Sequence, residues 1–89
     1  MFEFDLKKSK INKKKHGIDF IEAQALWSEI GIELTAKSVD EPRKLLIAKM
    51  NGKMWSAIFT IRNDRYRIIS VRRARKDEEA LYYAKKENT

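Results

Sequence analysis

The chain has 89 residues and a net charge of +7, with 20 lysines and arginines against 13 aspartates and glutamates. A chain of this length can bury one modest core, so we expect a single domain over residues 1–89. The absence of cysteine excludes disulfide frameworks, thiolate zinc sites and cysteine nucleophiles, and is compatible with the cytoplasmic location that we expect. No apolar stretch approaches the roughly 18–20 residues that span a bilayer, and no apolar secretory segment opens the chain. The positive charge favours a polyanionic partner such as nucleic acid, an acidic protein or an anionic membrane surface.

Residues 1–5 alternate Phe2 and Phe4 with polar neighbours, which predicts a short strand that adds to a sheet. Asp5 is then the predicted N-cap of a helix over residues 6–15. In this helix only Leu6 and Ile11 are available for apolar packing. Six lysines surround them: Lys7, Lys8, Lys10, Lys13, Lys14 and Lys15. These lysines form either a solvated face or a surface for nucleic acid or an acidic partner.

Gly17 is predicted to end that helix in the left-handed conformation. Asp19 and Glu22, three residues apart, predict a capping box at the start of a second helix. The apolar stripe of this second helix comprises Phe20, Ala23, Leu26 and Trp27. Such a stripe would pack on one face of a sheet, so we interpret the second helix as structural.

Residues 31–35 predict a short strand, and residues 36–42 a polar loop that holds the only proline. Residues 44–74 contain three strand-like runs separated by Asn51-Gly52 and Asn63-Asp64. Asn-Gly between apolar runs is a strong hairpin signal, because a type I′ turn needs two residues that tolerate positive φ; Asn-Asp is a weaker form of it. We therefore expect three antiparallel strands, and after them a final helix to about residue 86. That helix has four side chains available for contact: Ala80, Leu81, Tyr83 and Ala84.

Two-residue turns fix the register of the three strands by counting outward, so that Ile58 faces Ile69 and Thr60 faces both Arg67 and Arg43. Side chains then alternate between the two faces. The expected core face comprises Leu46, Ala48, Trp55, Ala57, Phe59, Ile61, Tyr66 and Ile68, with Ser70 and Arg72 at its end. The opposite face comprises Arg43, Leu45, Ile47, Ser56, Ile58, Thr60, Arg62, Arg65, Arg67, Ile69, Val71 and Arg73. This second face has an aliphatic floor ringed by arginines and hydroxyl groups.

Six of the seven arginines lie within residues 62–75. The guanidinium group is a planar, permanently charged fork that suits phosphate oxygens. The arginines therefore predict a phosphate-binding surface on the sheet. The alternative is that they solubilise an exposed sheet face or block an edge strand.

Two groups of residues form a pattern that covers nearly the whole chain. The first comprises Asp5, Lys8, Asn12, Lys15-His16-Gly17, Phe20 and Glu22-Ala23; the second comprises Arg43, Gly52, Thr60, Arg62, Arg67-Ile68-Ile69-Ser70, Arg72-Arg73-Ala74, Glu78 and Tyr82. On these residues the sequence resembles the BrnT family, the toxin halves of type II toxin–antitoxin modules. It departs from the family pattern at Ser28-Glu29, Pro42 and Ala48, none of which is a candidate phosphate-binding residue.

The resemblance implies a RelE-like α+β fold, with a small antiparallel sheet, two N-terminal helices packed on one face and a C-terminal helix. It implies ribonuclease activity that inhibits translation and growth. It also implies neutralisation by a BrnA-type antitoxin encoded by a neighbouring gene, and binding of operator DNA only by the toxin–antitoxin complex.

Metal-independent RNA cleavage uses the neighbouring 2′-OH as nucleophile and needs a base, an acid and cations that stabilise the phosphorane. The single histidine excludes a two-histidine acid–base pair, and no grouping of Asp, Glu and His suggests a metal ion or other cofactor. We interpret Arg62, Arg67 and Arg73 as phosphate-stabilising residues. His16 is the candidate for proton transfer, because histidine ordinarily titrates near neutrality. The RNA-binding candidates are Lys15, Arg43, Thr60, Arg65 and Tyr82.

Some of these residues have plainer interpretations. His16 would then be a surface residue near a helix end, and Tyr82 a packing residue. Arg72 points to the core side by the same count, so we assign it a structural or rim role.

Two other functions fit the sequence. A non-catalytic nucleic-acid-binding or antitoxin-binding remnant of such a toxin would bind RNA or DNA with steep salt dependence and give no cleavage products. The second of these functions is that of a domain that only binds an acidic protein. A neighbouring gene for a short DNA-binding antitoxin would favour the toxin.

Overall fold

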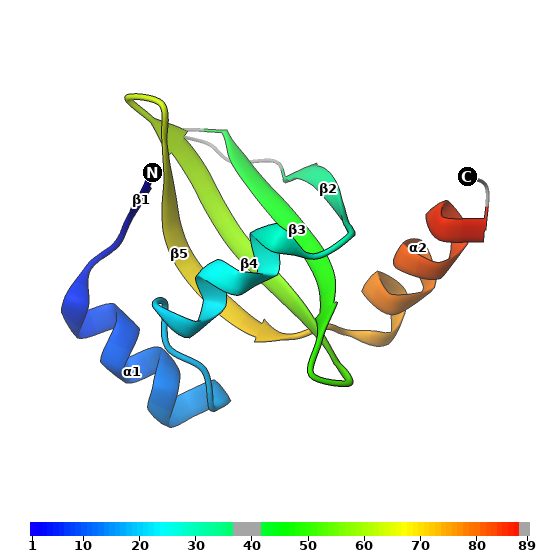
Figure 1. Ribbon diagram of the computed structural model, residues 1–89, viewed down its shortest axis with the longest axis horizontal. Coiled ribbons are helices and arrows are strands. Elements are labelled where there is room, and N and C mark those ends of the chain that lie inside the picture. The colour runs from blue at the N-terminus through cyan, green and yellow to red at the C-terminus, as the bar shows by residue number, and fades with distance from the viewer. Residues whose placement is uncertain (37–41, 88–89) are drawn as a thin grey trace.

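A computed structural model of the chain describes residues 1–36 and 42–87. Within them lies a five-stranded sheet in the order β1-β5-β4-β3-β2, with helices on either side of it (Figure 1). The elements are β1 (Phe2–Glu3), α1 (Leu6–His16), the 3₁₀ helix η1 (Glu22–Ser28), β2 (Gly31–Ala36), β3 (Arg43–Met50), β4 (Lys53–Arg62), β5 (Arg65–Arg73) and α2 (Lys76–Glu87). The α+β class is confirmed. Residues 37–41 of the expected polar loop lie outside the described residues.

Both hairpin turns form as the sequence predicts. Asn51 and Gly52 have φ of 54° and 76°, and Asn63 and Asp64 have φ of 50° and 62°. Positive φ at both central residues is what a type I′ turn requires. Strands β3, β4 and β5 consequently pair antiparallel. The sheet as a whole is mixed rather than antiparallel, because β1 pairs in parallel with β5.

Helix α1 has the predicted caps but not the predicted packing. Asp5 Oδ1 accepts hydrogen bonds from the backbone N–H groups of Lys7 and Lys8 at 2.8 and 3.1 Å, and Gly17 ends the helix with a φ of 79°. Leu6 and Ile11, however, are 65% and 54% exposed. The buried residues of α1 are instead the polar Ser9 and Asn12. The helix is therefore attached by hydrogen bonds rather than by an apolar stripe.

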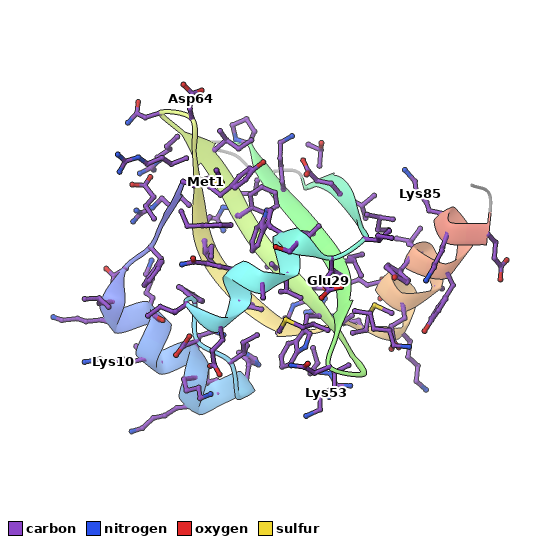
Figure 2. All side chains as sticks on the ribbon, in the orientation of Figure 1. Met1, Lys10, Glu29, Lys53, Asp64 and Lys85 are labelled. Carbon is purple, nitrogen blue, oxygen red and sulfur yellow. The ribbon has the colours of Figure 1, made fainter. Side chains whose placement is uncertain are left out.

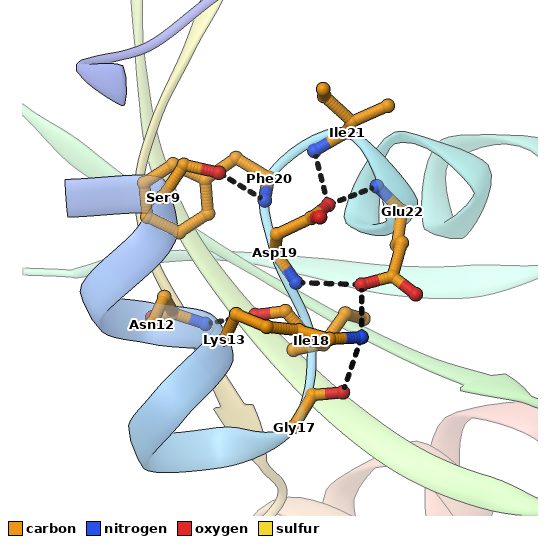
Figure 3. Close-up of polar contacts among 9 residues, drawn as sticks. All are labelled: Ser9, Asn12, Lys13, Gly17, Ile18, Asp19, Phe20, Ile21 and Glu22. Carbon is orange, nitrogen blue, oxygen red and sulfur yellow. Dashed lines mark hydrogen bonds and ion pairs between the residues drawn. The ribbon is translucent and has the colours of Figure 1, made fainter. Parts of the chain in front are cut away.

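The second helix, η1, begins with the predicted capping box (Figure 3). Asp19 Oδ1 accepts from the N–H of Glu22 at 2.8 Å, and Asp19 N–H donates to Glu22 Oε1 at 3.0 Å. The helix is 3₁₀ rather than α. The three-residue spacing of Phe20, Ala23 and Leu26 suits three residues per turn, and all three are buried.

Helix η1 crosses one face of the sheet, while α1 lies beside β5 (Figure 1). Two N-terminal helices packed on the same face are therefore not confirmed. The main core lies under η1 and comprises Ile18, Phe20, Ala23, Leu26, Leu46, Ala48, Trp55, Ala57, Phe59, Ile68 and Val71. Each large apolar side chain buried there contributes about 1.5–3 kcal/mol.

A smaller cluster lies on the opposite face, under α2. Its buried members are Ile47, Met54 and Tyr82, and half-buried Ile32, Leu34 and Leu45 pack beside them. Of the expected aliphatic floor, Leu45 and Ile47 belong to this cluster. The residues that α2 buries are Glu78 and Tyr82, one turn apart. The expected contact residues Ala80, Leu81, Tyr83 and Ala84 are partly or largely exposed, with Leu81 and Tyr83 each at 45%. The contact face of this helix was therefore predicted wrongly.

Candidate nucleic-acid interface

A β-bulge in β5 decides which side chains share a face of the sheet. From the Asn63-Asp64 turn the pairing follows the predicted count as far as Phe59 with Ile68. The next pair is Ile58 with Ser70, not Ile58 with Ile69. Ile69 is therefore an extra residue opposite Ile58. Beyond Ile69, every residue of β5 is displaced by one position from the register that counting outward from the turn predicts.

The displacement reverses the expected faces at the end of β5. Val71 is fully buried in the main core, whereas Arg72 pairs with Ser56 on the opposite face. Arg73 pairs with Trp55, and its guanidinium carbon lies 5.7 Å from the centroid of the Trp55 ring. Arg73 is thus on the η1 face, and the register argument that grouped it with the other candidate arginines is wrong. Counting outward from a turn assumes a regular ladder, and nothing in the sequence marks the bulge.

Other arginines gather at the far end of the sheet, beside the turn that Asp64 marks in Figure 2. Arg62 pairs with Arg65 across this turn, and Arg67 pairs with Thr60, so all three arginines lie on the face opposite η1. Arg43 begins β3 at the same end, one residue beyond the pair of Lys44 with Phe59. Arg43, Arg62 and Arg65 are exposed, and Arg67 is half-buried. We call Arg43, Arg62, Arg65 and Arg67 the arginine cluster.

Two predicted RNA-binding residues are buried. Thr60 is 3% exposed, and its hydroxyl donates to the Pro42 carbonyl at 2.9 Å, which holds the start of β3 beside β4. Tyr82 is 4% exposed within the smaller cluster, and its hydroxyl donates to the Ile30 carbonyl at 3.4 Å. The burial of Tyr82 favours its packing interpretation.

His16 and Lys15 lie apart from the arginine cluster, in a hollow of about 170 Å³ between α1 and β5. The residues that line it are Lys8, Ile11, Asn12, Lys15, His16, Ile69 and Ser70. Arg65 and Ser70 pair with Arg62 and Ile58, which are four residues apart on β4, and so they lie about 13 Å apart along the sheet. His16, which lines the hollow with Ser70, therefore lies at a different place along β5 from Arg65. Arg67, three residues before Ser70, is the cluster member of β5 closest to the hollow along the strand.

Arg72 has a structural partner that the sequence analysis missed. Its guanidinium forms a two-pronged ion pair with Glu78, with Nη1–Oε1 and Nη2–Oε2 distances of 2.7 and 2.8 Å. The Ser56 hydroxyl and the Arg75 N–H also donate to Glu78 Oε1, at 2.9 and 2.8 Å. The ion pair joins α2 to β5. The available signal was the position of Glu78 in the first turn of the predicted helix, where a Glu side chain can accept the N–H of the residue three positions earlier.

These contacts set the charge state of the pair. The hydrogen bond from Arg72 lowers the pKa of the Glu78 carboxyl to about 2, helped by the Arg75 N–H and the Ser56 hydroxyl and opposed by burial. The same hydrogen bond raises the pKa of the Arg72 guanidinium. The pair is therefore fully ionised at neutral pH, and the charge of Arg72 is neutralised within the fold. This agrees with the structural role predicted for Arg72, although its predicted face was wrong.

Over residues 1–36 and 42–87, no three His, Asp or Glu side chains gather closely enough to hold a metal ion. No helix in that part of the chain is long and apolar enough to cross a membrane. A family model described as the ribonuclease toxin BrnT of type II toxin–antitoxin systems matches residues 4–78. The match covers well over half of the chain and includes the arginine cluster, the hollow and Glu78. Among curated proteins, none matches the chain.

Proposed function

Given that this chain belongs to the BrnT family of ribonuclease toxins of type II toxin–antitoxin systems, we propose that it is an endoribonuclease that cleaves RNA in the cytoplasm without a metal ion. In the proposed reaction the ribose 2′-OH attacks the adjacent phosphorus as a base takes its proton. The bond to the 5′ oxygen breaks, an acid protonates that oxygen, and a 2′,3′-cyclic phosphate remains. Cleavage inhibits translation and growth. A BrnA-type antitoxin neutralises the protein, and only their complex binds operator DNA.

The arginine cluster is the observation that carries this proposal. Its guanidinium groups can each present two parallel N–H donors to phosphate oxygens. No carboxylate in the described part of the chain forms an ion pair with Arg65 or Arg67. The charges of these two side chains therefore remain available to an anion, in contrast to that of Arg72.

The distances along β5 divide the proposed roles. Arg67, nearest to the hollow on that strand, stabilises the charge that develops on the phosphorane. His16 acts as either the base or the acid of the reaction. Arg43, Arg62 and Arg65 hold the RNA backbone on one side of the reacting phosphate, and Lys15 holds it on the other. Arg73 has no place in this arrangement, because it lies on the opposite face of the sheet.

The test is cleavage of single-stranded RNA by the purified protein in the presence of EDTA. Arg67→Ala is the informative variant, with Arg75→Ala as its control, because Arg75 is also exposed but lies beyond the sheet at the start of α2. We expect cleavage by the wild type and by Arg75→Ala, and a loss of about 10²–10³-fold in Arg67→Ala, typical of removing one preorganised donor. Cleavage that EDTA abolishes would contradict the metal-free mechanism.

The toxin function has a separate test in cells. We expect growth arrest and RNA fragments when the protein is expressed alone, and relief of both when the neighbouring gene is expressed with it. Arrest without relief would contradict the proposed antitoxin.

The separation of His16 from Arg62 and Arg65 favours a second candidate function, a non-catalytic remnant that binds RNA or its antitoxin. Such a protein would bind RNA with an affinity that falls steeply with salt. It would release no fragments with or without EDTA. Binding without fragments from a folded protein would establish this candidate over the enzyme.

A further inference from the structure

The bulge in β5 gives the hollow between α1 and β5 its chemistry. Successive side chains of a regular strand point to opposite faces. Because Ile69 is the extra residue opposite Ile58, both Ile69 and Ser70 line the same hollow. The bulge therefore brings a hydroxyl group to a place that a regular strand would fill with an aliphatic side chain.

Asn12 holds this irregular part of the strand. The last pair between β1 and β5 is Glu3 with Arg67, so the strand needs another partner beyond that point. The Asn12 carboxamide donates to the Val71 carbonyl at 2.8 Å and accepts from the Val71 N–H at 3.2 Å, as a peptide group of a neighbouring strand would. Its amide nitrogen also donates to the Ile18 carbonyl at 2.8 Å. Asn12 thus fixes α1 against β5 one residue after Ser70.

A second polar contact fixes the same side of α1 one turn earlier. The Ser9 hydroxyl accepts a hydrogen bond from the Phe20 N–H at 2.9 Å (Figure 3). Ser9 and Asn12 are the buried residues of the helix. Lys8 is adjacent to Ser9, and Lys15 is about one turn after Asn12. These two hydrogen-bonded residues therefore place both lysines at the hollow. The helix is therefore a fixed wall of the hollow.

The hollow carries positive charge. Its ionisable lining residues are Lys8, Lys15 and His16, and no carboxylate lines it among the described residues. The acidic residue at the start of α1, Asp5, accepts two backbone N–H groups as the N-cap. The partial negative charge of the helix C-terminus lies at His16, about 12 Å along the helix from Lys8, and Lys15 offsets it at that end of the hollow. Lysine ammonium and serine hydroxyl groups are common contacts of nucleic-acid phosphates.

The size and position of the hollow limit which ligands it can bind. Its volume of about 170 Å³ is well below the roughly 300–1,000 Å³ of pockets that enclose a drug-sized molecule. It can take one phosphate group but not a nucleotide. Arg67 and Ser70 pair with Thr60 and Ile58, which are two residues apart on β4, so they lie about 7 Å apart along the sheet and on the same face.

We propose that this hollow binds one backbone phosphate of single-stranded RNA, next to the phosphate at Arg67. Lys8 and Ser70 contact that phosphate together with Lys15, and Asn12 is the positioning residue. The inference rests on the proposed function, because it takes RNA to be the ligand of this face. It adds two binding residues and gives the RNA a path from the arginine cluster along β5 to α1.

The test measures binding of a 2′-O-methyl oligoribonucleotide, which lacks the attacking hydroxyl, by fluorescence anisotropy at several salt concentrations. The variant carries both Lys8→Gln and Ser70→Ala. Its control is Lys7→Gln, which removes an equal charge from an exposed lysine that does not line the hollow. We expect the double variant to bind at least tenfold more weakly, with a salt slope smaller by about one unit. Lys7→Gln should weaken binding less than threefold.

A second measurement on the wild type does not depend on the variant folding. Titration with inorganic phosphate, followed by the amide signals in NMR, should shift the signals of Ile69 and Ser70 before those of Trp55 and Leu26 in the main core. Unchanged signals at Ile69 and Ser70 would overturn the inference.

The outcomes also separate this inference from the proposed function. If the wild type cleaves RNA and the double variant binds as tightly as Lys7→Gln, the proposed phosphate site in the hollow is overturned, and the proposed ribonuclease function is not affected. A wild type that neither binds nor cleaves RNA overturns both.

Discussion

The two halves of β5 use the same residue type for opposite purposes. Before the bulge, Arg65 and Arg67 lie at the end of the sheet beside the Asn63-Asp64 turn, where they pair with Arg62 and Thr60 of β4. After the bulge, Arg72 is locked to Glu78, and Arg73 covers the ring of Trp55. In the first half no carboxylate of the described residues pairs with the arginines, and in the second half Arg72 and Arg73 contact side chains of the fold.

The partners of each arginine, rather than its residue type, decide its role. A buried carboxylate that accepts from three donors neutralises Arg72, whereas Arg73 is exposed and lies over an aromatic ring. Figure 2 shows Lys10 on α1 and Lys85 on α2 at opposite sides of the molecule, so positive charge is spread widely. The net charge of +7 therefore does not locate the RNA surface by itself. The predictions that follow test this division of β5.

The largest effect on stability should come from Glu78→Gln. The change leaves Arg72 partly buried without its counter-ion, which typically costs about 3–5 kcal/mol. We expect a loss near 3 kcal/mol because Arg72 keeps some contact with water, and a fall in Tm of more than 10 °C. Thermal unfolding measures both. Glu79→Gln, a change of the adjacent carboxylate on the same helix, should stay within about 0.5 kcal/mol of the wild type, and an equal loss in both variants would contradict the ion pair's role.

Asn12→Ala should come next. It removes three hydrogen bonds and leaves the Val71 N–H and the carbonyls of Val71 and Ile18 without this partner. An unsatisfied buried group costs about 1–3 kcal/mol, and water entering at the edge of the sheet offsets part of the total. We expect a loss of about 2 kcal/mol in urea unfolding. A loss below 0.5 kcal/mol would show that α1 is held by other contacts.

The ion pair also predicts how stability depends on pH. Because the folded-state pKa of Glu78 lies near 2, below the ordinary value of about 4.5, its contribution is complete above pH 4.5 and is lost as the pH falls towards 2. That loss should reach roughly 2 kcal/mol. The stability of wild type minus that of Glu78→Gln, measured by urea unfolding from pH 7 to pH 2.5, should therefore shrink only below pH 4.5. A constant difference over that range would contradict the assignment.

Arg73→Ala should have the smallest effect on stability. An exposed guanidinium over an aromatic ring contributes about 0.5–1 kcal/mol. Arg73 is exposed and Trp55 stays in the main core without it, so we expect a loss within that range by thermal unfolding. A loss above 2 kcal/mol would mark Arg73 as a structural residue of the same rank as Arg72.

The sequence was sufficient wherever structure depends on residues close together in the chain. The Asn51-Gly52 and Asn63-Asp64 turns and the caps at Asp5 and Asp19 were predicted because each depends on a few adjacent residues. The positions of Arg62, Arg65 and Arg67 followed correctly, since all three lie within a few residues of a turn. The arginine cluster could therefore be predicted.

What could not be predicted depends on contacts between distant residues. The bulge at Ile69 has no glycine to mark it, and it is held by Asn12, whose partner Val71 lies 59 residues away in the chain. Without the bulge the count placed Arg73 on the wrong face. The sequence analysis gave Ser9 and Asn12 no packing role, although their spacing of three residues on one side of a helix was an available sign. The contact face of α2 was missed because one of its two buried residues, Glu78, is charged and the other, Tyr82, was interpreted as an RNA-binding residue.

The division of β5 is tested most directly by comparing RNA cleavage by Arg67→Ala and Arg73→Ala at equal concentrations of folded protein. Both variants remove one guanidinium from the same strand, on opposite sides of the bulge and on opposite faces of the sheet. The account predicts that Arg67→Ala loses about 10²–10³-fold in cleavage rate and that Arg73→Ala stays within about threefold of the wild type. A large loss in Arg73→Ala with little change in Arg67→Ala would contradict it, and would place the reacting phosphate on the η1 face.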